Sequence, residues 1–393
     1  LAMSRMKTML AATVLGTLMH STAAAEIAVP IAQLIIDEAR PPVLSNLDPE
    51  PQDLGQAGAD LGLQDNTTTG RFMGHAYSLT TTQVAEGEDP LPAARAALAK
   101  APFLLIDGPA EALTAIADLP EAAGKLLFNT GAEDPALRSE TCRANVLHTV
   151  PSLAMRTDAL VQFFVQKRWS DIVMITGPHP KDRAYAAAME RSLAKFRLDL
   201  AATKDWTFDA DMRRNAAQEV PLFTQDFGDY DALVVADETH DFGRYILYNT
   251  WQARPVTGSE GLTAVAWAPV VEQWGAAQLQ SRFQDLAGRA MRPEDYANWA
   301  AIRAIGEAVT RTGSGDPATL RAFMLSDDFE LAGFKGRPLT FRQWNGQLRQ
   351  PIPLVHPRAL VASAPLEGFL HQRSELDTLG LDQPESACSA FVP

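Results

Sequence analysis

Short apolar runs alternate with longer amphipathic segments from residue 27 onward, which is the pattern of βαβ units and a parallel sheet. A helix opens at Pro51, and the polar stretch 66–70 is expected to close it as a structural turn. The expected strands span 32–36, 75–81, 103–106 and 125–128, and further helices span 91–100 and 111–119. Together they predict a first lobe.

The same pattern starts again after an extended passage at 146–152. The expected strands of this second lobe span 171–176, 198–203, 231–236 and 263–267, and its helices span 160–165, 183–196, 209–220 and 242–251. Two consecutive α/β sheets joined by an extended crossing predict a two-lobed α/β protein that binds a ligand in a cleft beyond the carboxyl ends of its strands.

Three further features complete the pattern. Residues 296–312 predict a core helix with apolar residues along one face. Asn345-Gly346 predicts a two-residue hairpin turn between strands at 339–344 and 347–354. The tail, residues 363–393, is weakly periodic and contains prolines, so we expect it to wrap over the surface.

The N-terminal residues 1–25 have the pattern of a secretory signal peptide. Arg5 and Lys7 precede an apolar run at 9–19, and Ala23-x-Ala25 supplies the small residues of a cleavage site. Cleavage after Ala25 leaves no N-terminal cysteine for a lipid anchor. We therefore expect a soluble protein exported to the periplasm.

Charge and cysteine content fit an exported protein that binds no nucleic acid. The formal net charge is −14, and phosphate binding requires a basic patch. Cys142 and Cys388 are the two cysteines. Because the periplasm is oxidising, they predict one disulfide, with two free thiols as the alternative.

Four loops follow expected strands at their carboxyl ends: 107–109, 129–131, 177–181 and 237–240. Each precedes a helix N-terminus, whose free N–H groups and positive dipole end favour an anionic or carbonyl oxygen. Simple turn formation is the alternative for each loop. The candidate ligand contacts in these loops are Gly108, Pro109, Asn129, Thr130, Gly131 and Glu238.

Basic residues gather near the expected cleft. Arg156 lies just past the crossing, and His179, Lys181 and Arg183 follow the first strand of the second lobe. Such a rim predicts a ligand that bears a carboxylate. Solvated surface charges are the alternative.

One tryptophan is a candidate for stacking on a planar ligand. Trp267 ends the expected strand 263–267, where the chain returns toward the first lobe. Trp251 and Trp299 have helical spacing and are expected in the core.

Signatures of catalysis and metal binding are missing from the sequence. Residues 258–261 are one residue short of a nucleophile elbow, and neither a Walker phosphate loop nor a dinucleotide-binding glycine motif is present. The histidines show no pair at a helical metal spacing. We expect a binding protein without cofactor or metal and not an enzyme.

The order of elements resembles the type I periplasmic binding proteins of ABC transporters, in the Leu/Ile/Val-binding branch. The resemblance rests on residues 103–110, 126–132, 146–149 and 296–312, on Gly333-x-x-Gly336 and on the Trp344 hairpin. It implies a monomer with two Rossmann-like lobes, three hinge crossings near Thr149, Ala268 and Gly336, hinge closure and a partner permease. The implied domains are a first lobe of 26–149 plus 269–336, a second lobe of 150–268 plus 337–362, and the tail.

Residues 65–72, 142–152 and 273–275 are similar to a subgroup associated with alcohol oxidation that depends on pyrroloquinoline quinone (PQQ). That similarity implies PQQ, or a solute of that pathway, as the ligand. A branched-chain amino-acid-binding protein is the alternative, although residues 108–111 lack the hydroxyls of amino-acid binders. A third hypothesis is an accessory or assembly partner of a PQQ-dependent dehydrogenase.

Overall fold

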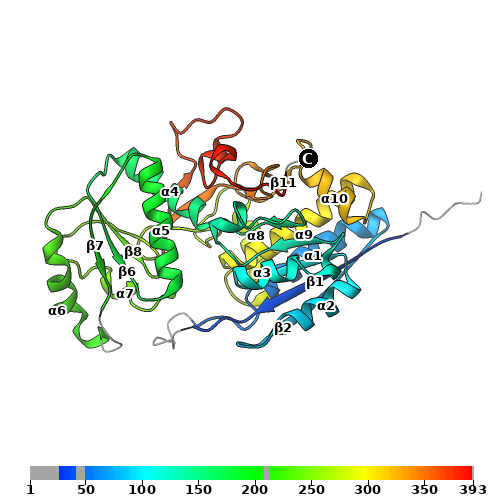
Figure 1. Ribbon diagram of the computed structural model, residues 1–393, viewed down its shortest axis with the longest axis horizontal. Helices are drawn as coiled ribbons and strands as arrows, with labels where there is room; N and C mark the ends of the chain where they lie inside the picture. Colours follow the sequence, from blue (N-terminus) through cyan, green and yellow to red (C-terminus); the bar gives the residue numbers. More distant parts are fainter. Residues whose placement is uncertain (1–25, 41–48, 208–211, 392–393) are drawn as a thin grey trace, which may run out of the picture.

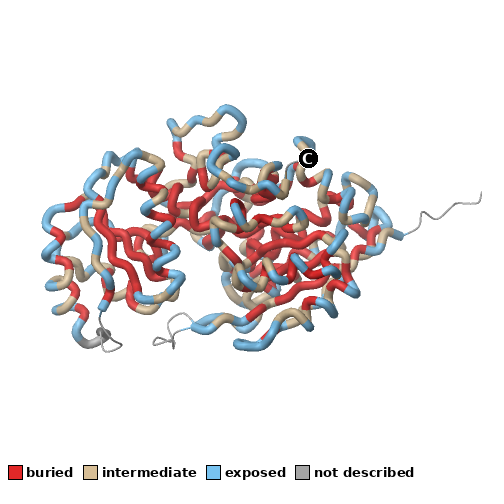
Figure 2. The backbone as a smooth tube through the Cα atoms, in the orientation of Figure 1, coloured by how far each residue is buried: buried red, intermediate tan, exposed pale blue. Residues whose placement is uncertain are grey.

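The computed structural model describes residues 26–40, 49–207 and 212–391, so the expected signal peptide lies outside the described residues. Two α/β lobes lie side by side, and the C-terminal segment runs above the region between them (Figure 1). Each lobe has its own buried interior (Figure 2). In the described ranges, no helix combines the length and apolar character needed to span a membrane.

A parallel sheet of five strands, in the order β2-β1-β3-β4-β5, forms the centre of the first lobe. Its strands are β1 (Ile27–Ile36), β2 (His75–Val84), β3 (Phe103–Asp107), β4 (Leu126–Asn129) and β5 (Val146–His148). Phe103 and Leu105 enter the core shared with α1 and α9, whereas Leu104 and Ile106 enter the core shared with α2 and α3. Since both faces of the sheet are covered, its central strands are continuous apolar runs.

Helices cover both faces of this sheet. They are α1 (Gln56–Met73), α2 (Leu91–Lys100), α3 (Ala110–Ala117), α8 (Ala276–Ala287), α9 (Pro293–Thr312) and α10 (Pro317–Met324), with the short turns η1 (Pro120–Ala122) and η2 (Pro135–Arg138). α1 and α9 approach each other closely at Gly58. A Cβ atom at this position would lie only 1.9 Å from the carbonyl oxygen of Asp295. The expected core helix 296–312 is confirmed as the last four-fifths of α9.

The second lobe has a parallel sheet of four strands in the order β7-β6-β8-β9. Its strands are β6 (Ile172–Thr176), β7 (Leu200–Asp205), β8 (Ala232–Ala236) and β9 (Val256–Gly258), and its helices are α4 (Leu153–Lys167), α5 (Pro180–Lys195), α6 (Met212–Thr224) and α7 (Gly243–Ile246), with η3 (Gln225–Phe227). Met174 and Val234 pack with α4 and α5, whereas Val173 and Leu233 pack toward α6 and α7. Two parallel-sheet lobes confirm the predicted architecture.

Two small antiparallel sheets follow the parallel ones. They contain β10 (Thr263–Ala264), β14 (Ile352–His356) and β15 (Ala359–Ala364) in one, and β11 (Leu331–Ala332), β12 (Pro338–Phe341) and β13 (Leu348–Arg349) in the other. β12 and β13 pair antiparallel around Asn345 and Gly346, which confirms the predicted hairpin. Gly346 has a φ of 68°, as such a turn requires.

Three crossings connect the lobes. The chain leaves the first sheet after His148 and enters α4 at Leu153. It returns between Ala264, in the core of the second lobe, and Ala266, in the core of the first. It crosses again between Leu348 and Ile352, later than the expected position near Gly336, because the β12–β13 hairpin packs in the core of the first lobe. The lobe boundaries inferred from the resemblance remain predictions.

Residues 66–70 do not form the expected turn, because α1 continues through them to Met73. Gly74 ends the helix with a left-handed φ of 71°. The polar side chains are accommodated within the helix: Asn66 is buried and donates to the carbonyl oxygen of Ile302 at 2.7 Å, and Thr68 donates to the carbonyl oxygen of Gln64. A helix packed on α9 therefore tolerates a sequence that is typical of a turn.

Two predicted elements of the second lobe were too long. The strand expected at 263–267 is the two-residue β10, which pairs antiparallel with β14, and β9 takes the fourth place in the parallel sheet. The helix expected at 242–251 is α7, which covers four residues. Trp251, expected in the core, lies in the bend after it and is 59% exposed. Residues 209–211 of the helix expected at 209–220 lie outside the described residues, and the rest of that helix lies within α6.

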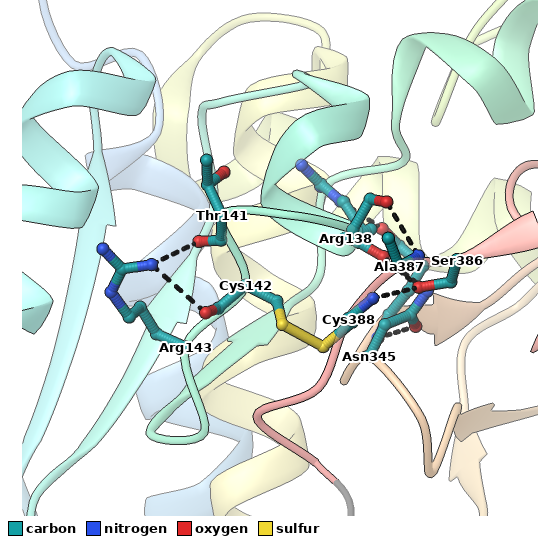
Figure 3. Close-up of a disulfide and its surroundings, with 10 residues drawn as sticks. Arg138, Thr141, Cys142, Arg143, Asn345, Ser386, Ala387 and Cys388 are labelled. Atoms are coloured by element: carbon teal, nitrogen blue, oxygen red, sulfur yellow. Dashed lines mark hydrogen bonds between the residues drawn. A yellow bond between two sulfur atoms is a disulfide. The ribbon is translucent and has the colours of Figure 1, made fainter.

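The predicted disulfide between Cys142 and Cys388 is confirmed (Figure 3). It attaches the end of the tail to the loop before β5. The tail contains the short turns η4 (Glu375–Thr378) and η5 (Gln383–Glu385). It is not only a surface wrap, because Leu376 and Leu379 are buried.

Candidate functional site

The loops at the carboxyl ends of the two sheets meet through ion pairs, and we call this place the junction. Lys181, after β6, pairs with Glu38, after β1, at 3.0 Å. Arg156, in α4, pairs with Glu133 in the loop after β4. Each pair joins one lobe to the other, so the junction is where a bound molecule would contact both.

Arg156 is the centre of the junction. Its terminal nitrogens donate to both carboxylate oxygens of Glu238 at 2.7 and 3.2 Å, and one of them also donates to Glu133. Its Nε atom donates to the carbonyl oxygen of Ala264 at 3.0 Å. We define the Arg156 cluster as Arg156, the two carboxylates that it contacts, Ser259 and Tyr185.

The two carboxylates of the cluster share Arg156 unequally. Burial raises the pKa of Glu133, and the charge of Arg156 only partly offsets this. Burial acts in the same direction on Glu238, but Arg156 and the hydroxyl of Ser259, which donates at 2.8 Å, outweigh it and lower the pKa of Glu238. For Arg156, burial opposes the charge and the two carboxylates outweigh it, so its pKa lies well above the ordinary value. One cation therefore faces two carboxylates.

Tyr185, in α5, completes the cluster. The guanidinium carbon of Arg156 lies 5.5 Å from the centre of the Tyr185 ring, within the range of a cation–π contact. The ring is fully buried, and its hydroxyl has no hydrogen-bond partner among the described residues. Burial raises the pKa of Tyr185, with Glu238 and Glu133 among the nearby charges. A buried hydroxyl without a partner is a group that a ligand can satisfy.

The N–H groups expected to hold a ligand oxygen in the second lobe have partners within the chain. Asp182 accepts from the backbone N–H of His179 at 3.1 Å and from that of Glu238 at 2.7 Å. Asp237 accepts from the N–H groups of residues 241–243, at 2.9, 2.9 and 2.6 Å. Burial raises the pKa of Asp182 to about 6 and that of Asp237 above its ordinary value. The chain's own carboxylates thus occupy the place of an anion.

The loops of the first lobe close on themselves in a similar way. Asn129 is buried, and its amide oxygen accepts from the N–H groups of Gly131 and Ala132. Thr130 is also buried and donates to the carbonyl oxygen of Ile106. Gly131 packs on Asp107, since a Cβ atom there would lie 2.6 Å from its carboxylate.

Gly108 and Pro109 lead from β3 into α3. Gly108 packs on Ile36, whose Cβ atom would lie 2.8 Å from a Cβ atom at position 108. Pro109 stands at the N-terminal cap position of α3 and has no N–H group. The structure brings both residues to the carboxyl edge of the first sheet, close to the loop that carries Glu133.

The other predicted basic residues lie at the junction or at its edge. His179 lies 3.4 Å from Asp241, through Nε2 and a carboxylate oxygen. Lys181 is about half exposed and pairs with Glu38. Arg183 is farther out: its side chain is 60% exposed and lies 3.9 Å from Asp205. The side chains of the expected basic rim thus lie beside acidic side chains of the chain itself.

Trp267 lies away from the Arg156 cluster, in the core of the first lobe. It is 2% exposed and stacks on Tyr296, with ring centres 4.9 Å apart and planes within 10°. Its Nε1 atom donates to Gln280 at 3.2 Å. Because β10 ends at Ala264, Trp267 belongs to the return crossing and packs beneath α9 instead of ending a strand.

Several junction residues were not anticipated from the sequence. Glu133 stands two residues beyond the predicted loop 129–131, and Ser259 itself was not among the candidate residues. Tyr185 carries no local signal, since it is one of several apolar positions of α5. Glu260 lies nearby, with a carboxylate oxygen 3.8 Å from Nδ1 of His240, and raises the pKa of that histidine.

Asp107, at the end of β3, is a buried acid near the junction. It accepts from Asn298 at 2.9 Å, and Gly55 and Gly131 lie so close that a Cβ atom on either would clash with its carboxylate. Burial raises its pKa to about 7 against the effect of that hydrogen bond. The nearby charges of Glu294 and Asp295 contribute to this rise.

Across the described ranges, no group of His, Cys, Asp and Glu side chains is arranged to hold a metal ion. Two surface hollows lie away from the junction. One lies beside α3 and η2, and the other lies between α5 and β7. We take the Arg156 cluster, which joins residues of both lobes, as the candidate site.

No protein-family model and no curated protein matches the chain, but solved structures do. A branched-chain amino acid ABC transporter periplasmic ligand-binding protein from Burkholderia xenovorans has 16% identity over 93% of this chain and 100% of its own, with a TM-score of 0.69. A periplasmic binding protein from Burkholderia mallei has 12% identity over the same shares, with a TM-score of 0.65. A branched-chain amino acid substrate-binding protein from Streptococcus pneumoniae, in complex with isoleucine, has 12% identity over 86% of this chain and 98% of its own, with a TM-score of 0.63.

At these identities the likeness concerns the fold. The two structures from Burkholderia align with 93% of this chain, which contains two parallel α/β sheets. The chain has the type I periplasmic binding protein fold.

Proposed function

We propose that this protein is the substrate-binding component of an ABC transport system and holds a small solute at the junction. The observation that carries the proposal is that Arg156 contacts Glu133 of the first lobe and Glu238 of the second. A solute that enters this cluster contacts both lobes at once. Its binding free energy then favours the closed arrangement, which is how a two-lobed receptor couples binding to closure. The descriptions of the similar structures as transporter binding proteins support the same reading.

We infer further that the solute carries a protonated amine. The Arg156 cluster has one cation and two carboxylates, so it has a surplus negative charge. Lys181 is already balanced by Glu38. Asp182 and Asp237 occupy the N–H groups that would hold a carboxylate of the ligand in the second lobe. An ammonium group on the solute balances the surplus negative charge and donates a hydrogen bond to Glu133. A neighbouring acceptor on the solute accepts a hydrogen bond from the hydroxyl of Tyr185.

An amino acid is the simplest solute of this kind. The similar proteins include one from Desulfitobacterium hafniense in complex with Leu and the one from Streptococcus pneumoniae with isoleucine, which supports this choice. The narrower hypothesis of PQQ rests on the sequence similarity of residues 65–72, 142–152 and 273–275. A tricarboxylate would compete with Glu133 and Glu238 for Arg156, so the two ligands predict opposite effects of the same substitution. The hypothesis that the protein assists a PQQ-dependent dehydrogenase applies only if the protein binds PQQ.

The proposal places the protein in the periplasm as a monomer that delivers its solute to an inner-membrane permease and performs no chemistry on it. The pattern of residues 1–25 supports export. A disulfide between Cys142 and Cys388 supports an oxidising compartment.

The experiment is a panel of thermal unfolding measurements on the purified chain without residues 1–25. Leucine, isoleucine, 4-methylpentanoate, which is leucine without its amine, and PQQ are each added in excess. A bound solute stabilises the protein by about 2.7 kcal/mol at 100 times its Kd. We expect a shift with leucine or isoleucine and none with 4-methylpentanoate. A shift with PQQ alone would replace the amine hypothesis, and turnover of any added solute would overturn the binding-protein proposal.

A further inference from the structure

The C-terminal tail forms a connection between the lobes in addition to the three crossings. After β15, which belongs to the second lobe, the tail follows α4 and α5 and then reaches the first lobe at Cys142 (Figures 1 and 3). We define residues 365–391 as the strap. Its two ends are held by different lobes, so the strap spans the same boundary that the hinge crossings span.

Leu366, Thr378 and Gly380 of the strap are bound to the second lobe. Asp158 of α4 accepts from the backbone N–H of Gly380 at 2.7 Å, and Lys195 of α5 donates to the carbonyl oxygen of Gly380 at 2.8 Å. Gln162 bonds both the N–H of Leu366 and the hydroxyl of Thr378. Asp158 is fully buried, so these contacts are shielded from salt and water.

Residues 376–381 of the strap are also bound to the β12–β13 hairpin of the first lobe. Asp377 is buried and accepts from Arg342 at 2.9 Å and from Arg349 at 2.8 Å. Arg342 also donates to the carbonyl oxygens of Leu376, Leu379 and Leu381, at 3.0, 2.5 and 3.3 Å. The arginine thus holds three peptide carbonyls of the strap, within residues 376–381, in place.

The end of the strap is bound to the loop before β5. Ser386 donates to the carbonyl oxygen of Arg138 at 2.8 Å, and the N–H of Ala387 donates to the hydroxyl of Ser139 at 2.9 Å. The disulfide to Cys142 follows immediately (Figure 3). This end is covalent, whereas the attachment to α4 and α5 is not.

We propose that the strap is a fourth, disulfide-closed connection that limits how far the two lobes separate. If the lobes swing apart about the crossings 149–152 and 349–352, the distance between α5 and Cys142 changes, and a strap held at both ends resists the change. Breaking the disulfide leaves only the ion pairs and hydrogen bonds of the strap to attach it to the first lobe, and this weaker attachment permits wider opening. The proposal rests on the proposed function only in that the lobes move; it does not depend on which solute binds.

The test compares the native mature chain with the Cys142→Ser/Cys388→Ser variant, both without solute, by hydrogen exchange and small-angle X-ray scattering. We expect about tenfold faster exchange at the crossings 149–152 and 349–352, which corresponds to about 1.4 kcal/mol, with unchanged exchange in β3 and β8. The radius of gyration should increase. Arg337→Gln, which breaks only the exposed pair between Arg337 and Glu375, is the control and should change neither quantity.

Unchanged exchange and scattering in the double variant would overturn the proposal. Equal acceleration throughout, β3 and β8 included, would show a loss of general stability and would also overturn it. If the double variant does not fold, the same two measurements are made on the native chain after its disulfide has been reduced and the thiols alkylated. Because no solute is added, these outcomes are independent of whether the ligand hypothesis holds.

Discussion

Arg156 binds Glu238 through both terminal nitrogens but Glu133 through one. Glu238 has a further donor in Ser259, whereas Arg156 is the one side-chain donor to the Glu133 carboxylate among the described residues. The pKa of Glu238 is accordingly lowered, while burial raises that of Glu133. Of the two carboxylates, Glu133 is therefore the one whose ionised form is less well stabilised in the folded protein. It is the one that we expect a ligand to contact.

This asymmetry predicts the order of two matched substitutions. Glu238→Gln should lower the free energy of unfolding by about 1–3 kcal/mol, because a charged bidentate contact to buried Arg156 is weakened. Glu133→Gln should change it by less, because the substitution also removes a poorly solvated charge and its repulsion with Glu238. Urea unfolding at neutral pH measures both values. A larger loss for Glu133→Gln than for Glu238→Gln would contradict the unequal sharing.

Asp107 predicts a pH dependence of stability. Its folded pKa of about 7 lies above the ordinary value of 3.8, so the folded state binds more protons than the unfolded state between these values. Its contribution to stability is therefore complete below about pH 4 and is lost as the pH rises to about 7. Asp107→Asn should remove this loss, so that the variant gains stability relative to the native chain between pH 4.5 and pH 7.5.

Asp285, which is exposed in α8, provides the control for Asp107. Asp285→Asn should leave the pH dependence of urea unfolding as it is in the native chain. A native-like slope for Asp107→Asn would mean that Asp107 is not the titrating group.

The contact between α1 and α9 predicts a non-additive pair. A Cβ atom on Gly306 would lie 2.1 Å from the amide oxygen of Asn66. Gly306→Ala should therefore lower stability, although alanine is favoured over glycine in a helix by about 1 kcal/mol. In the Asn66→Ala background the clash is absent, so the same substitution should cost less, with a coupling of about 0.5–3 kcal/mol in thermal or urea unfolding. Additive effects would contradict the close approach.

The buried ion pair between Asp377 and Arg342 predicts how much the strap contributes to the free energy of unfolding. Asp377→Asn leaves Arg342, which is buried, without a carboxylate partner, and should lower the free energy of unfolding by about 3–5 kcal/mol. Glu375→Gln changes an exposed pair two residues away and should alter it by less than about 1 kcal/mol. Comparable losses for the two variants, measured by urea unfolding, would show that the buried pair does not hold the strap.

The sequence predicts those parts of the fold that depend on local pattern. Residues 103–106 and 172–176 are buried on both faces of their sheets, so these apolar runs stand out clearly as parallel strands. The turn at Asn345-Gly346 requires a particular backbone geometry, which its residue types reveal. Residues 66–70 were misread because their propensity is typical of a turn, whereas a tertiary contact between Asn66 and Ile302 keeps them helical.

The site was predicted only in part, for a related reason. Arg156 and Glu238 follow from their places after a crossing and a strand, but the sequence does not reveal that they bind each other and Glu133. The basic rim at Lys181 looks available for a carboxylate until Glu38, distant in the sequence, is seen beside it. Trp267 is predicted as a ligand contact because a strand over 263–267 would end at the cleft. The strand instead ends at Ala264, and the chain then enters the core of the first lobe.

The central claim is that a solute binds through the Arg156 cluster, and calorimetric titration of Glu133→Gln tests it most directly. The best solute of the panel is titrated into the native chain, into Glu133→Gln and into Glu140→Gln, an identical change at an exposed residue of the same lobe. For an amine-bearing solute we predict an affinity about tenfold or more weaker with Glu133→Gln, as expected for a charged hydrogen bond of about 1.5–3 kcal/mol, and unchanged affinity with Glu140→Gln. Equal affinities in all three proteins would contradict binding at this cluster, and tighter binding to Glu133→Gln would show that the solute competes with Glu133 for Arg156 as a carboxylate.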